Sequence, residues 1–182
     1  MVAEFKELYD TIVNSETFHS WFAKNPKVQL SHFFAQINQN YIPTSAWDLG
    51  FFNPEDEKIT VFTLNEANEI IQKNTDDVFK QKQAKVHTLD PKELDNFLDF
   101  KDSIVYCQKA IEDSFPGIDS LRGSGFAILQ TLQDDTKEEE SLLPTWNISF
   151  ITKKLSFLNI KLEASSGKLI STKEHSMMSP KK

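Results

Sequence analysis

The clearest structural pattern in this chain lies in residues 143–170, LPTWNISFITKKLSFLNIKLEASSGKLI. Apolar and polar side chains alternate on either side of Trp146 and again from Leu158 to Leu162, the period-two pattern of a strand with one buried face. Ser165-Ser166-Gly167 is typical of a turn, and residues 168–171 form a last short strand-like run. The stretch therefore predicts an antiparallel meander with one apolar face.

An earlier stretch, residues 44–71 (TSAWDLGFFNPEDEKITVFTLNEANEII), repeats this pattern at a constant offset and without a gap. The aligned positions are Trp47 with Trp146, Leu49 with Ile148, Phe51 with Phe150, Ile59, Val61 and Thr63 with Leu158, Ile160 and Leu162, Asn68 with Gly167, and Ile70-Ile71 with Leu169-Ile170. Any two alternating meanders can be aligned, and identity is low. A Trp opens both stretches, however, and both turns keep their lengths, which favours duplication of one β-unit.

Helical patterns flank these strands. Apolar residues three or four apart predict one helix over residues 1–13, a second capped by Ser15, and a third over residues 27–38. Another helix is expected from Ser103 to Ser114, ahead of a strand over residues 126–132. The predicted fold class is α+β: two tandem helix-plus-antiparallel-sheet units, one α-β-β-β and one α-β-β-β-β, with extra N-terminal helices.

This fold class divides the chain into five parts. They are N-terminal helices (1–25), a first unit (26–79), a connector (80–101), a second unit (102–172) and a tail (173–182). Around the connector the pattern is ambiguous: residues 75–85 suit a helix, and Asp90-Pro91 suits the start of a short one.

The second unit resembles the PepSY domain. The resemblance rests on Leu143-Pro144-Thr145-Trp146, on the run from Leu158 to Ile170 and on the helix ahead of them, and it covers about residues 102–172. That family has a Trp strand, a strand ending in Asp-Ala, a Thr-Gly turn and a final strand. Here Glu163 stands for the Asp and Ser166 for the Thr.

The resemblance implies a cystatin-like α+β fold, with residues 27–73 as a more diverged first copy. It also implies a role as a peptidase inhibitor or a regulatory binding module. The residues that carry the resemblance are structural, because Trp146 fills a core and Gly167 permits a positive φ in the turn.

Composition disfavours several classes of function. The chain has 182 residues, and its net charge of −7 with 20 scattered Lys and Arg residues disfavours nucleic acid as a partner. The single cysteine, Cys107, leaves no intrachain disulfide and suits a reducing compartment. No run of about 18 apolar residues is present, and residues 1–13 suit an amphipathic helix better than a signal peptide. We therefore expect a cytoplasmic protein with no membrane partner.

The reactive residues form no catalytic or metal-binding pattern. The four histidines lie far apart and match no zinc motif: His19, His32, His87 and His175. Cys107 lies on the inner stripe of its helix, which favours a buried structural thiol. Gly123-Ser124-Gly125 matches neither a phosphate loop nor a nucleophile elbow and suits a strand-entry turn. We predict no catalytic, cofactor-binding or metal-binding residues and no cofactor.

Other residues invite a functional interpretation but have a simpler one. Trp47 and Trp146 suit either surface anchors for a partner or core residues, and their apolar neighbours two positions on favour the core. His32 suits a packed or half-exposed position on the helix over residues 27–38. The acidic loop 134–140 suits a solvated surface.

These observations favour a non-enzymatic protein-binding or peptide-binding regulatory module of PepSY-like type, using a sheet edge or the concave face of the sheet. The alternative is a small-molecule-binding protein or an enzyme with a cavity between helices and a curved sheet. Self-association is a third option. A deep pocket with converging polar groups would favour the second hypothesis, and a filled core with an exposed sheet edge the first.

Overall fold

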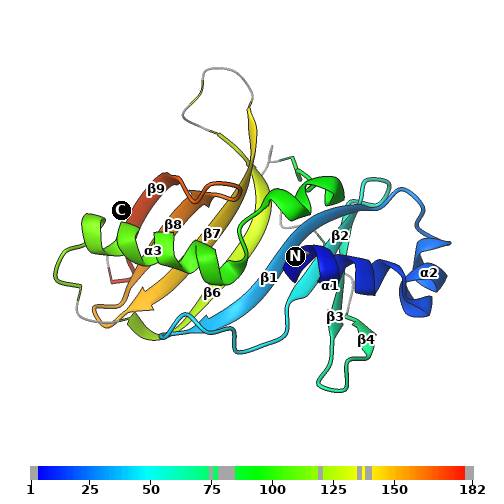
Figure 1. Cartoon of the computed structure of the whole chain (residues 1–182), viewed down its shortest axis with the longest axis horizontal. Helices are drawn as coiled ribbons and strands as arrows, with labels where there is room; N and C mark the ends of the chain where they lie inside the picture. Colours follow the sequence, from blue (N-terminus) through cyan, green and yellow to red (C-terminus); the bar gives the residue numbers. More distant parts are fainter. Residues whose placement is uncertain are drawn as a thin grey trace.

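The computed structural model describes residues 4–73, 76–77, 85–118, 121–134, 137 and 141–178. One antiparallel sheet runs through the molecule in the order β4-β3-β2-β1-β6-β7-β8-β9, with β5 also paired to β3 (Figure 1). The strands are β1 (Gln29–Asn38), β2 (Asp48–Asn53), β3 (Lys58–Leu64), β4 (Ile70–Gln72), β5 (Asp76–Asp77), β6 (Leu121–Gln133), β7 (Leu142–Thr152), β8 (Ser156–Glu163) and β9 (Leu169–Ser176). The helices are α1 (Glu4–Val13), α2 (Glu16–Phe22), the 3-10 helix η1 (Pro91–Asn96) and α3 (Phe100–Ser114).

The central joint of the sheet is the antiparallel pairing of β1 with β6, from His32–Gln130 to Asn38–Ser124. This joint fuses the two halves of the chain into a single sheet that dominates the structure. The predicted fold class, two tandem helix-plus-sheet units with extra N-terminal helices, is therefore wrong. β9 also continues to Ser176, beyond the predicted end of the second unit at residue 172.

The predicted helix over residues 27–38 is also wrong, because this segment forms β1. The register between β1 and β2 shifts between Leu30 and His32, so that Ser31 is an extra residue at a β-bulge. The bulge leaves Leu30 and Phe33 both buried at a spacing of three residues. That spacing imitates one face of a helix and explains the error.

The face of the sheet away from the helices also carries apolar side chains near the β1–β6 joint. Phe34 of β1 stacks against Phe126 of β6, with ring centroids 6.2 Å apart. A strand with apolar residues on both faces loses its clean alternation. On the same face the ring of His32 lies over Gly50, where a Cβ atom would come within 2.2 Å of it, so glycine permits this close approach.

The gap-free alignment of the two β-stretches does not hold. β7 and β8 pair Phe150 with Leu158, whereas β2 and β3 pair Phe51 with Thr60, one residue later than the alignment requires. Side chains alternate between the two faces of a strand. A register shift of one residue therefore turns the side chains of β3 that the alignment places toward the helices to the other face. Phe62 is therefore fully buried. The aligned residues Ile59, Val61 and Thr63 face away from the helices.

Several smaller predictions are confirmed. Ser15 caps α2, Asp90 caps η1 with Pro91 as its first residue, and the helix predicted from Ser103 exists as α3. A helix was predicted over residues 75–85. Two of these residues form the strand β5, and the others, except residue 85, lie outside the described residues. In the described part of the chain, no helix has the length and apolar character needed to cross a membrane.

The core lies between the sheet and the helices, where aromatic rings from distant parts of the chain meet. The ring centroid of Phe5, in α1, is 5.0 Å from that of Phe33, 5.0 Å from that of Trp47 and 5.2 Å from that of Trp146. Phe100, in α3, contacts both Trp rings, which are 5.9 Å apart. The predicted core position of both tryptophans is confirmed, and α1 and α3 cover the same face of the sheet (Figure 1).

We expect Phe5→Ala to lower the free energy of unfolding by about 3–5 kcal/mol, because it opens a cavity among the three rings that Phe5 contacts. Phe22→Ala removes a ring that is 39% exposed and should cost less than half as much. Urea unfolding followed by tryptophan fluorescence measures both losses. Equal losses would contradict the central role of Phe5.

Candidate functional site

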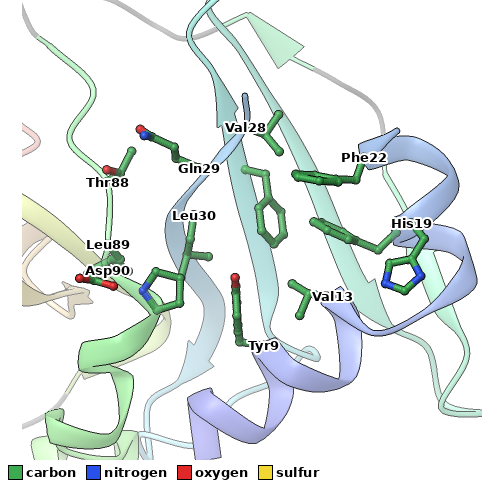
Figure 2. A pocket seen from close by; sticks show the side chains of 13 residues that line it. Tyr9, Val13, His19, Phe22, Val28, Gln29, Leu30, Thr88, Leu89 and Asp90 are labelled. Atoms are coloured by element: carbon green, nitrogen blue, oxygen red, sulfur yellow. The ribbon is translucent and has the colours of Figure 1, made fainter. Parts of the chain in front are cut away.

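A groove of about 600 Å³ opens between α1, α2, the start of β1 and residues 88–91 (Figure 2). We call it the α1–α2 groove. Its apolar wall is formed by Val13, Phe18, Phe22, Val28, Leu30, Phe51, Leu89 and Pro91. Polar atoms are added by Tyr9, His19, Gln29, Thr88 and Asp90. A concave, mainly apolar surface with a few polar groups is typical of ligand-binding sites.

The turn between α1 and α2 builds one side of the groove. Ser15 Oγ accepts a hydrogen bond from Phe18 N at 3.1 Å and donates one to Ile12 O at 2.6 Å. Such a cap fixes where the second helix begins. The short α2 then places Phe18 over Phe51, with ring centroids 4.9 Å apart, and leaves Phe22 partly exposed at the rim.

The opposite side of the groove is built by a segment that passes through an opening in the sheet. β1 and β6 separate beyond the pair His32–Gln130. Residues 85–87 line a second groove, of about 330 Å³, on the face away from the helices, whereas residues 88–91 line the α1–α2 groove. The chain thus changes faces where the two central strands diverge.

Two hydrogen bonds hold this crossing segment between the strands. Leu89 N donates to Leu30 O of β1 at 2.8 Å, and Thr131 Oγ1 of β6 donates to Thr88 O at 2.9 Å. Both bonds use backbone atoms of the segment, so its path is fixed by the strands on either side of it.

Tyr9 and Asp90 are the polar groups with the most defined surroundings. Burial raises the pKa of the Tyr9 phenol, against the opposing effect of the Lys6 charge and with smaller contributions from the charges of Asp10 and Asp90. The phenol therefore remains a hydrogen-bond donor at neutral pH. Asp90 Oδ1 accepts a hydrogen bond from Lys92 N at 2.9 Å. No hydrogen bond joins Tyr9, His19 and Asp90 to one another among the described residues, so the groove contains no acid–base pair.

The structure disperses most of the histidines. His19 lies at the α1–α2 groove, whereas His32 and His87 both line the second groove and His175 lies in β9. Burial lowers the pKa of His32, whose Nδ1 lies 3.1 Å from Ser31 Oγ. Within the described ranges, no three His, Cys, Asp or Glu residues are placed to hold a metal ion.

Two other candidate sites from the sequence, Cys107 and Gly123-Ser124-Gly125, lie within a helix and a strand of the fold. Cys107 is fully buried in α3, as predicted, and burial raises the pKa of its thiol to about 12. Gly123-Ser124-Gly125 is not a turn before a strand but lies within β6, where the register with β7 shifts between Leu121 and Gly125. The acidic loop 134–140 lies mostly outside the described residues.

No family model matches this chain, and no curated protein or solved structure matches it either. The PepSY-like resemblance of residues 102–172 therefore stays a prediction.

No pattern in the sequence indicated the α1–α2 groove directly. The Ser15 cap and the aromatic residues of α2 predicted a short helix with one apolar face. They did not indicate which part of the protein that face packs against. The wall formed by residues 88–91 depends on a contact with Leu30, which lay on a segment predicted to be helical. No local pattern could have shown this contact.

We expect the Cys107 thiol to resist labelling by a disulfide reagent such as DTNB at pH 8 in the folded protein and to react fully in urea. Its raised pKa adds no pH dependence to stability below the ordinary thiol value of 9.0 and lowers stability as the pH rises from 9.0 to about 12, because only the unfolded chain ionises there. Absorbance at the reagent wavelength measures the labelling. Rapid labelling without urea would contradict a buried thiol.

Proposed function

We propose that this protein is a non-enzymatic binding module that holds a short apolar segment of a protein or peptide in the α1–α2 groove. One observation carries the proposal: an aromatic-lined concave surface lies beside the partly exposed ring of Phe22, at the edge of a filled core. Aromatic residues, Phe included, are enriched in the parts of protein surfaces that become buried when a partner binds. The groove also lacks an acid–base pair among its described residues, which favours binding over catalysis.

A peptide segment suits this groove because its two sides come from separate short elements, α1 with α2 on one side and residues 88–91 on the other. The core beneath is filled by packed rings, such as Phe18, Phe51 and Phe62, and provides no closed chamber. A small apolar molecule is the second candidate, because a volume of about 600 Å³ also falls in the range of small-molecule sites.

The sheet edge at β9 is a weaker candidate for peptide binding. β9 pairs with β8 and ends the strand order of the described sheet. It carries Lys173, Glu174 and His175, which are exposed. Charged side chains on edge strands disfavour the addition of another strand.

We place the protein in the cytoplasm. Its single cysteine has no partner within the chain for a disulfide, and reducing compartments favour this composition.

A groove-filling variant tests the proposal. A peptide library displayed on phage is selected against the wild-type protein, and the enriched peptides are synthesised with a fluorescent label. We expect Val28→Trp to weaken their binding at least tenfold in fluorescence anisotropy, because the larger side chain occupies the half-buried apolar wall.

Val105→Trp is the matched control, since Val105 is 64% exposed on α3 and does not line the groove. This control should bind the peptides as the wild type does. Urea unfolding checks that both variants are folded. The proposal fails if no peptide is enriched or if the two variants weaken binding equally. Binding of apolar fragments without peptide enrichment would favour the small-molecule candidate instead.

A further inference from the structure

We infer that the ligand of the α1–α2 groove carries a positively charged group beside its apolar anchor, and that Asp90 pairs with this group. In chemical terms, the partner is a peptide segment with Lys or Arg close to a bulky apolar residue. This inference rests on the proposed function and specifies the ligand class of the same site.

Asp90 is the only carboxylate among the described residues that line the groove. Its side chain is held in place, because Oδ1 accepts the hydrogen bond from Lys92 N and the preceding residue, Leu89, is bonded to β1. A carboxylate has about four acceptor sites on its two oxygens, so one cap bond leaves Asp90 able to bind a cation.

No lysine, arginine or histidine forms an ion pair with Asp90 within the described part of the chain. Lys6 of α1 pairs with Asp10. Asp90 and Tyr9 line the same groove, so a ligand held there lies close to the Asp90 charge. The chain as a whole carries a net charge of −7, which further favours a cationic ligand.

The two ends of the groove have different chemistry. Figure 2 shows Asp90 on one side of the groove and Phe22 on the other, with Tyr9 between them. A ligand that places an apolar side chain near Phe22 can therefore extend a cationic group toward Asp90. The phenol of Tyr9 can donate a hydrogen bond to a carbonyl of the ligand between the two contacts.

The test compares two charge-neutralising variants on the peptides that the phage selection yields. Asp90→Asn removes the charge but keeps the cap, because asparagine is as good an N-cap residue as aspartate. Asp95→Asn is the matched control: it makes the same change at an exposed position of η1 outside the groove.

We expect the enriched peptides to share Lys or Arg next to an apolar residue. Asp90→Asn should weaken their binding by about three- to fivefold, the upper part of the range for the loss of one exposed ion pair. Asp95→Asn should change binding less than twofold. Raising the salt concentration from 50 to 500 mM should weaken wild-type binding more than Asp90→Asn binding, since salt screens the ion pair.

The outcomes separate this inference from the proposed function. If the enriched peptides lack basic residues, or if both Asn variants behave alike, the inference is wrong. The proposed function then still stands, provided that Val28→Trp weakens binding. If no peptide is enriched by the wild-type protein, both the inference and the proposed function are wrong.

Discussion

The pairing of β1 with β6 holds the two halves of this protein together. It joins strands that lie far apart in sequence and makes one sheet from both halves of the chain. Because the halves share a sheet, the ring centroids of Trp47 and Trp146 lie 5.9 Å apart, and Phe5 packs against both rings. One helix from each half then covers a common core instead of separate ones.

The end of that pairing has a second consequence. Beyond His32–Gln130 the two strands diverge, and the opening admits the segment that runs from residue 85 to residue 91. The segment satisfies backbone groups in the opening through its bonds to Leu30 and Thr131. It then emerges on the helix side and forms a wall of the α1–α2 groove. The candidate site therefore depends on the position at which the pairing of β1 with β6 ends.

The groove combines a firm base with an open rim. Beneath it, the rings of Phe18, Phe51 and Phe62 pack at centroid distances of 4.9 to 5.8 Å, which gives the apolar wall a fixed shape. At its rim, the ring of Phe22 is only partly covered. A preorganised apolar wall lowers the entropic cost of binding, because few side chains need to be ordered when a ligand arrives.

The local features of this protein could be predicted from its residues without the structure. Alternation predicted strands around Phe51, Phe150 and Leu158, and side-chain oxygen atoms marked the helix starts at Ser15 and Asp90. These features follow from side-chain period and capping, which depend on near neighbours. The strand over residues 29–38 could not be predicted in this way, since a bulge and apolar residues on both faces imitate a helical spacing. The shifted register of β3, the fusion into one sheet and the groove could not be predicted either. Those features depend on which distant segments pair, and the local sequence around each segment does not show its partner.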